Sequence, residues 1–232
     1  MTILDFIKRA DPANVAIAAP EWEPLTYGGL AALVGKTLQS LNGAGLGRTD
    51  KVAIVMPNGP LMATAFVAVS AGCIAAPLNP AFREDEFRFY MEDLNTKALI
   101  VENDSTSPAI AAAASLGIPL IDLVPHKLAG DFSLRPLTRG DTRNGGLMGT
   151  DETALVLHTS GTTSKPKIVP LTQGNLTASA NNIARTLRLI SADRCLNIMP
   201  LFHIHGLVAA VLATLSGGGL VTISRCVMPN GS

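Results

Sequence analysis

Residues 51–80, KVAIVMPNGPLMATAFVAVSAGCIAAPLNP, form the stretch that decides the fold. Its first run, KVAIVMPNG, has the composition of a buried strand that ends in a turn. Pro60 then suits the first turn of a helix over residues 60–71, and the run CIAAPLNP predicts the next strand. A strand, a helix and another strand in this order are typical of α/β proteins with largely parallel sheets.

The same alternation continues toward the C-terminus. The segment REDEFRFYMEDLN puts four apolar or aromatic residues on one helical face: Phe87, Tyr90, Met91 and Leu94. Further strands are predicted in KALIVEN, IPLIDLV, ETALVLHTS, KIVPL and LVTIS. Further helices are predicted in SPAIAAAASLG, in residues 172–189 with Thr172 as N-cap, and in residues 207–215. We therefore expect an α/β fold with stacked, largely parallel sheets flanked by helices.

Residues 126–150 interrupt this alternation, because they mix charges with Pro136 and the run RNGGLMG. We predict a linker or surface loop there. It would separate a first α/β portion, residues 1–125, from a second, residues 151–232. The chain stops soon after the strand LVTIS, which favours an incomplete fold over a finished one.

The composition limits the classes of function. The chain has 232 residues, is 47% hydrophobic and has a formal net charge of +0, so nothing suggests non-specific binding to nucleic acid or to an anionic membrane. Its three cysteines, Cys73, Cys195 and Cys226, are far apart and suggest neither a disulfide framework nor a zinc site. The most apolar stretch, 61–76, is short for a membrane span of about 20 residues, and the N-terminus is no signal peptide. We therefore expect no membrane span and a cytoplasmic location.

The stretch LHTSGTTSKPKIVPL, residues 157–171, gathers hydroxyl side chains and lysines around one glycine. A P-loop would need a second glycine where Pro166 stands and a serine or threonine where Ile168 stands. Proline has no N–H to donate to a phosphate, so the P-loop interpretation fails. Small donors and a flexible backbone still suit an anion. The residues alone leave open a phosphate-binding loop and a plain polar connection between strands.

The same loop resembles the S-G-T-T-G-x-P-K-G motif of the adenylate-forming enzymes, which include acyl-CoA synthetases. Other stretches resemble this family in the same order along the chain, and they cover nearly all of it: LTYGGL, VAIVMPNGPLMATAFVAVSAGCIAAPLNPAF and PLFHIHG. Ser164 and Ile168 depart from the motif, since both replace glycine. This variant is similar to that of oxalate–CoA ligases and related bacterial synthetases.

The resemblance implies activation of a small carboxylic acid by Mg²⁺·ATP to an acyl-adenylate, followed by thioester formation with coenzyme A. It implies that the loop holds the leaving pyrophosphate, with Lys167 assisting catalysis. The cofactor-binding residues would be Thr159, Ser160, Gly161, Thr162, Thr163, Ser164 and Lys167. It further implies a catalytic and substrate-binding role for His203, and substrate binding by His205 and Gly206.

Two histidines spaced like His203 and His205 could also ligate a metal on a strand, but no cysteine, aspartate or glutamate lies close by in the sequence to complete the set. No metal ligand is therefore predicted. The family's adenine motif and C-terminal domain are not found before Ser232, so the chain resembles part of the large N-terminal domain and is expected to be inactive alone. Two alternatives stay open: a non-catalytic nucleotide- or partner-binding module, and an adenylation enzyme that loads a carrier protein.

Overall fold

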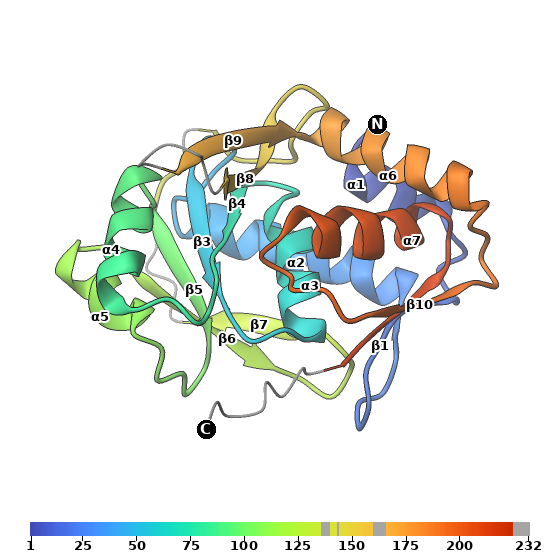
Figure 1. The fold of residues 1–232 in the computed structure, drawn as a ribbon, viewed down its shortest axis with the longest axis horizontal. Helices are drawn as coiled ribbons and strands as arrows, with labels where there is room; N and C mark the ends of the chain where they lie inside the picture. The colour runs from blue at the N-terminus through green and yellow to red at the C-terminus, as the bar shows by residue number, and fades with distance from the viewer. Residues whose placement is uncertain (136–139, 143, 160–165, 225–232) are drawn as a thin grey trace.

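The computed structural model describes residues 1–135, 140–142, 144–159 and 166–224. Within them, two sheets pack with helices into one α/β body (Figure 1). The strands are β1 Val15–Ala18, β2 Leu25–Thr26, β3 Lys51–Val55, β4 Ile74–Pro77, β5 Ala98–Glu102, β6 Leu120–Pro125, β7 Phe132–Arg135, β8 Thr153–Thr159, β9 Lys167–Thr172, β10 Arg194–Asn197 and β11 Leu220–Ile223. The helices are α1 Ile3–Arg9, α2 Tyr27–Gly43, α3 Pro60–Val69, α4 Glu84–Asp93, α5 Ala109–Ser115, α6 Gln173–Leu187, the π-helix η1 His205–Leu212 and α7 Ala213–Ser216.

The larger sheet has the strand order β7-β6-β5-β3-β4-β8-β9. Its centre is parallel, whereas the two outer strands, β7 and β9, are antiparallel to their neighbours. The burial pattern explains this arrangement, because β3 and β4 are apolar and buried along almost their whole length, as expected for strands covered on both faces. The prediction of an α/β fold with largely parallel sheets is therefore confirmed.

The smaller sheet has the order β10-β11-β1-β2 and brings the first strand of the chain beside the last described one. Ile17 in β1 is the register partner of Val221 in β11. Tyr27, the first residue of α2, ties this sheet to the helices: its buried hydroxyl donates to the carbonyl oxygen of Gly219 at 2.7 Å. Because no water reaches this hydroxyl, burial raises the pKa of Tyr27 well above its ordinary value.

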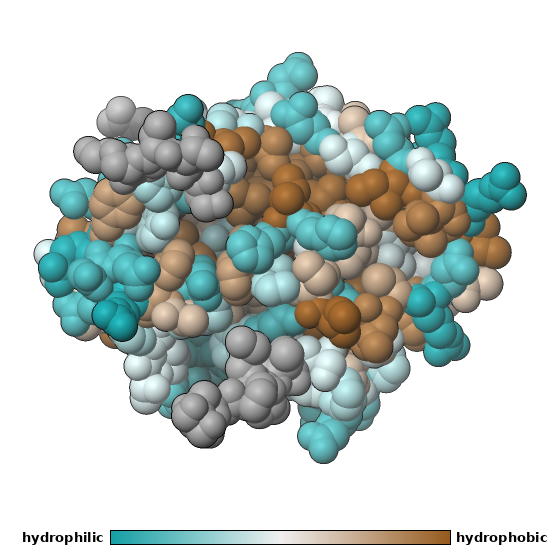
Figure 2. All heavy atoms as spheres, in the orientation of Figure 1, coloured by the Kyte–Doolittle hydropathy of each residue, from teal (hydrophilic) through white to brown (hydrophobic). Residues whose placement is uncertain are grey.

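Helix α3 is the centre of the core, since every residue from Pro60 to Val69 is buried. It packs against α2 and η1, while α4 and α5 pack together at the other side of the molecule (Figure 1). Figure 2 shows hydrophobic surface over the region where Figure 1 draws α7 and β10. Leu196 and Ile198, in and after β10, are among the most exposed large apolar residues of the described part.

Several predicted elements are confirmed at the level of single residues. The helix predicted over 60–71 is α3. Thr172 is the N-cap of α6, where its Oγ1 accepts a hydrogen bond from the amide of Asn175 at 3.1 Å. On α4, the side chains of Phe87 and Met91 are fully buried.

Two elements differ from the sequence-based expectation. Residues 126–150 contain the strand β7, which pairs antiparallel with β6. His203 and His205, considered above as neighbours on a strand, lie after β10, which ends at Asn197. The predicted helix over 207–215 begins earlier, at His205, as a π-helix. None of the helices in the described residues is long and apolar enough to cross a membrane.

Candidate active site

A cleft of about 470 Å³ lies at the carboxyl ends of the parallel strands β4 and β8. Ligands in open α/β sheets characteristically bind at this edge. Four segments line the cleft: the end of β4 with the loop to α4, helix α4 itself, the end of β8, and the turn that leads into η1. The lining residues are Pro77, Leu78, Asn79, Phe82, Tyr90, Leu157, His158, Thr159, Phe202, His203, Ile204 and His205.

Thr159 and Lys167 are the ends of the two strands that flank the hydroxyl-rich loop. Thr159 is the last residue of β8, Lys167 is the first of β9, and the two are register partners in the antiparallel pair. Both are exposed, and Thr159 lines the cleft. The other loop residues named from the sequence, Ser160, Gly161, Thr162, Thr163 and Ser164, lie outside the described residues.

The structure brings His203 and His205 to the same cleft as Thr159. His203 lies in the turn before η1, with its ring centroid 4.4 Å from that of Phe202, and His205 begins η1. Among the described residues, no group of three or more His, Cys, Asp or Glu side chains could hold a metal ion. Two exposed imidazoles on a turn can instead donate or accept hydrogen bonds toward a polar substrate.

Gly206 differs from its neighbours, because it is buried beneath this turn. A Cβ atom at this position would lie 2.5 Å from the carbonyl oxygen of Pro200 and 3.1 Å from that of Met199. Only a residue without a side chain lets η1 approach the turn so closely. In this structure Gly206 therefore sets the shape of the turn that carries His203.

Two asparagines that sequence reasoning did not select hold the same turn. Asn58, in the loop between β3 and α3, accepts the amide hydrogen of Leu201 on its Oδ1 at 3.0 Å. The buried Asn197, at the end of β10, accepts from the amide of Met199 at 3.1 Å and donates to its carbonyl oxygen at 3.2 Å. Asn58 follows a predicted strand within PNG, but no spacing links it to Leu201, 143 residues later.

His158 forms a second cluster at the cleft, together with helix α4. Its Nε2 lies 3.0 Å from Oδ2 of Asp93, and its ring meets the edge of Tyr90 with centroids 4.6 Å apart. Tyr90 in turn stacks on Phe82, at 4.8 Å and an interplanar angle of 7°. Burial, and then the carboxylate of Glu86, raise the pKa of Tyr90, so its hydroxyl is neutral at physiological pH. No local pattern could reveal this pairing, because His158 and Asp93 are far apart in the chain.

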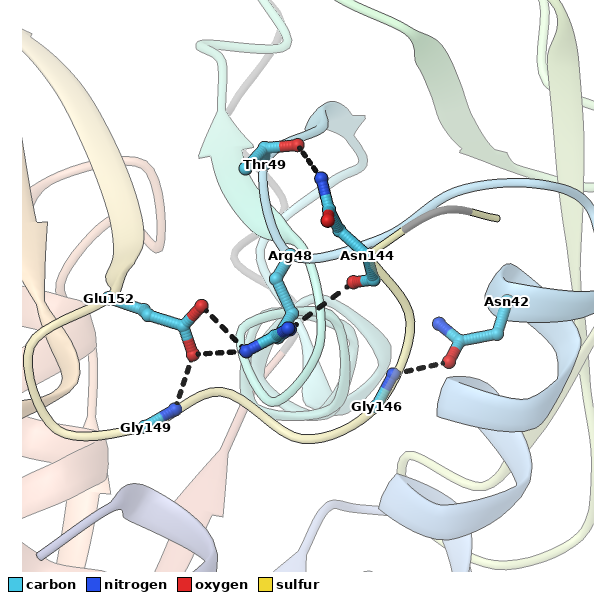
Figure 3. Close-up of polar contacts among 7 residues, drawn as sticks. All are labelled: Asn42, Arg48, Thr49, Asn144, Gly146, Gly149 and Glu152. Atoms are coloured by element: carbon cyan, nitrogen blue, oxygen red, sulfur yellow. Dashed lines mark hydrogen bonds and ion pairs between the residues drawn. The ribbon is translucent and has the colours of Figure 1, made fainter. Parts of the chain in front are cut away.

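A polar network fixes the other end of β8 (Figure 3). Arg48, just before β3, contacts both carboxylate oxygens of Glu152, at 2.9 and 3.1 Å. The Nε of Arg48 also donates to the carbonyl oxygen of Asn144 at 3.3 Å, and Glu152 accepts from the amide of Gly149 at 2.6 Å. Since Glu152 directly precedes β8, the network ties the start of this strand to the start of β3.

The chain is similar to known proteins over nearly its whole length. The family model described as AMP-binding enzyme matches residues 7–229. An oxalate–CoA ligase from Arabidopsis thaliana is 35% identical over 226 residues, which cover 95% of this chain and 44% of that protein. An oxalate–CoA ligase from Saccharomyces cerevisiae is 35% identical over 243 residues, which cover 90% of this chain and 45% of that protein.

The fold has close counterparts among solved structures. The crystal structure of apo MatB from Rhodopseudomonas palustris matches with a TM-score of 0.79 at 24% identity, covering 96% of this chain and 45% of that one. The chain therefore spans less than half the length of these two ligases and of MatB. This coverage agrees with the expected position in the N-terminal part of a longer fold.

Proposed function

Because the chain belongs to the family of AMP-binding enzymes, we propose that its full-length protein activates a carboxylic acid with ATP and transfers the acyl group to coenzyme A. Two relatives are named oxalate–CoA ligases, which supports a ligase that forms a CoA thioester. The chain spans less than half of their length, so we assign this activity to the longer protein and expect residues 1–232 to be inactive alone.

One observation carries this proposal: the end of β8, the β4–α4 loop and the histidine turn surround a single cleft. The cleft combines apolar walls, such as Leu157 and Ile204, with hydroxyl and imidazole groups. A small acid needs such walls for its carbon skeleton and a few polar groups for its carboxylate. The convergence of these segments favours a site that binds the acid beside a phosphate-binding loop.

We assign the residues the following roles. Lys167 and the hydroxyls from Thr159 to Ser164 would bind the phosphates that leave as pyrophosphate, because pre-placed donors stabilise developing charge. His203 would contact the carboxylate or the α-phosphate, with His205 beside it. Mg²⁺ would enter bound to ATP, where it neutralises phosphate charge.

Carboxylate-dependent exchange between ATP and pyrophosphate in the full-length protein tests this function. We expect exchange with at least one acid of a panel that starts with oxalate and extends to medium-chain acids. Lys167→Ala and His203→Ala should each lower the exchange rate by about 10²-fold or more, within the range seen when charge-stabilising groups are removed. Lys36→Ala, on the exposed face of α2, is the matched control and should leave the rate unchanged.

The outcomes separate this function from its alternatives. Nucleotide binding without exchange for any acid would support a binding module. Exchange without a coenzyme A thioester product would support loading of a carrier protein. Full exchange in both site variants would contradict the assignment of the site. The cytoplasmic location and the division near residues 126–150 stay predictions.

A further inference from the structure

The β8–β9 pair extends beyond the sheet that supports it. Ala75 in β4 is the register partner of Leu155 in β8. From there β4 runs for two more residues, to Pro77, whereas β8 runs for four, to Thr159. His158 and Thr159 therefore lie past the end of β4, and the remaining partner strand is β9.

A two-stranded ribbon is only marginally stable without packing on a further element. The outer strand β9 adds little burial, since Lys167, Ile168 and Pro170 are exposed. The end of the ribbon must therefore be held by side-chain contacts from another part of the fold.

His158 makes these contacts. Its side chain is only 8% exposed, although it comes from the projecting end of β8. The hydrogen bond to Asp93 and the ring contact with Tyr90 both reach helix α4. The ring of Tyr90 is itself stacked on that of Phe82. Thr159 follows His158 directly, and its register partner is Lys167.

We propose that His158 and Asp93 form a positioning pair that anchors the end of the β8–β9 ribbon to α4 and so holds Thr159 and Lys167 where the nucleotide-dependent step requires them. The proposed action of the pair is through the ribbon, because the imidazole Nε2 is engaged with Asp93. The catalytic part of this inference rests on the proposed function, whereas the anchoring part rests on contacts alone.

Amide hydrogen exchange in the full-length protein tests the anchoring without any need for turnover. His158→Ala and Asp93→Ala should each speed exchange in segments 156–159 and 167–169 by about fivefold, the factor expected for the loss of one hydrogen bond of about 1 kcal/mol. The chain contains a matched control pair, His126 and Asp131, whose side chains meet at 3.1 Å in the β6–β7 region. His126→Ala should leave these two segments unchanged. Unchanged exchange in both site variants would overturn the inference.

Steady-state kinetics test the positioning role. His158→Ala and Asp93→Ala should raise the KM for MgATP about fivefold while kcat changes less than about twofold, because binding of the phosphates is disturbed and the reacting groups are retained. His158→Gln keeps an N–H donor and Asp93→Asn keeps an acceptor oxygen, so each should restore most of the affinity. The KM for MgATP of the double alanine variant should be no higher than that of either single variant, because both substitutions remove the same contact.

The two proposals can fail separately. If the wild-type protein shows no ATP–pyrophosphate exchange with any acid, the proposed function is wrong. The amide hydrogen exchange result would still decide whether the pair anchors the ribbon. An active wild type whose KM for MgATP is unaffected by His158→Ala and Asp93→Ala would remove the positioning role alone.

Discussion

Replacing Gly206 by alanine should destabilise the chain through one identifiable collision. The new Cβ would lie 2.5 Å from the carbonyl oxygen of Pro200. Both crowded atoms are attached to backbone, so no side-chain rotation relieves the contact, and the turn must move by about half an ångström or more to reach a normal separation. Overpacking of this kind costs about 1–3 kcal/mol. Alanine recovers about 0.5–1 kcal/mol of helix propensity, so the net loss is up to about 2.5 kcal/mol, and about 1 kcal/mol at the middle of both ranges.

Equilibrium unfolding in urea measures this loss. Gly35→Ala is the control, since Gly35 lies within α2 and an added Cβ would meet nothing within 4 Å. Gly35→Ala should raise the free energy of unfolding by about 0.5–1 kcal/mol. Glycine-to-alanine substitution should therefore raise the free energy of unfolding at position 35 and lower it at position 206. Equal free energies of unfolding for the two variants would refute the reasoning.

The collision also has a consequence for the site. The Pro200 carbonyl oxygen that would be displaced accepts the amide hydrogen of His203 at 3.3 Å. In the full-length protein, Gly206→Ala should therefore raise the KM for the acid more than the KM for MgATP. An equal rise in both constants would argue against a local effect on the histidine turn.

Three further predictions concern other residues. Asn58→Ala should lower the free energy of unfolding by about 1 kcal/mol, because the amide of Leu201 loses its acceptor; Asn58→Asp, which keeps the oxygen, should lose less. A double-mutant cycle of Arg48→Met and Glu152→Gln should give a coupling energy of about 0.5–1 kcal/mol that shrinks in high salt, since both side chains are partly exposed; a coupling near zero would contradict the network. Burial, and then Asp50, raise the pKa of the Cys73 thiol to about 12. The unfolded chain loses this proton near its ordinary value of about 9, so the stability that Cys73 contributes is intact below pH 9 and declines as the pH rises toward 12. Between pH 8 and 10.5 the wild type should lose about 2 kcal/mol more than Cys73→Ala in urea unfolding, and equal losses would refute the assignment.

The parallel core was predictable because its signals are local. The runs around residues 51–80 are apolar without interruption, and Pro60 and Thr172 mark helix starts through their own backbone chemistry. The strand β7 was missed because it is short, half polar and paired at the edge of the sheet. Its formation depends on β6 and not on its own pattern.

The sequence was enough to identify the segments that form the candidate site, but not how those segments are arranged around the cleft. The loop and the histidine motif could be recognised in the sequence, and the cleft contains residues of both. The turn at His203 could not be foreseen, because the amide of Leu201 in this turn donates its hydrogen bond to the side chain of the distant Asn58. The pairing of His158 with Asp93 likewise follows from the sheet order, which no local pattern encodes.

The position of β1 in the middle of the smaller sheet has a consequence for biosynthesis. Its register partners in β11 lie about 200 residues later. At about 5–20 residues per second, the ribosome needs roughly 10–40 s to deliver them. Throughout that interval the apolar segment VAIA has an open edge in the nascent chain, which makes it a natural binding site for a holding chaperone and a point where slowed translation would promote aggregation.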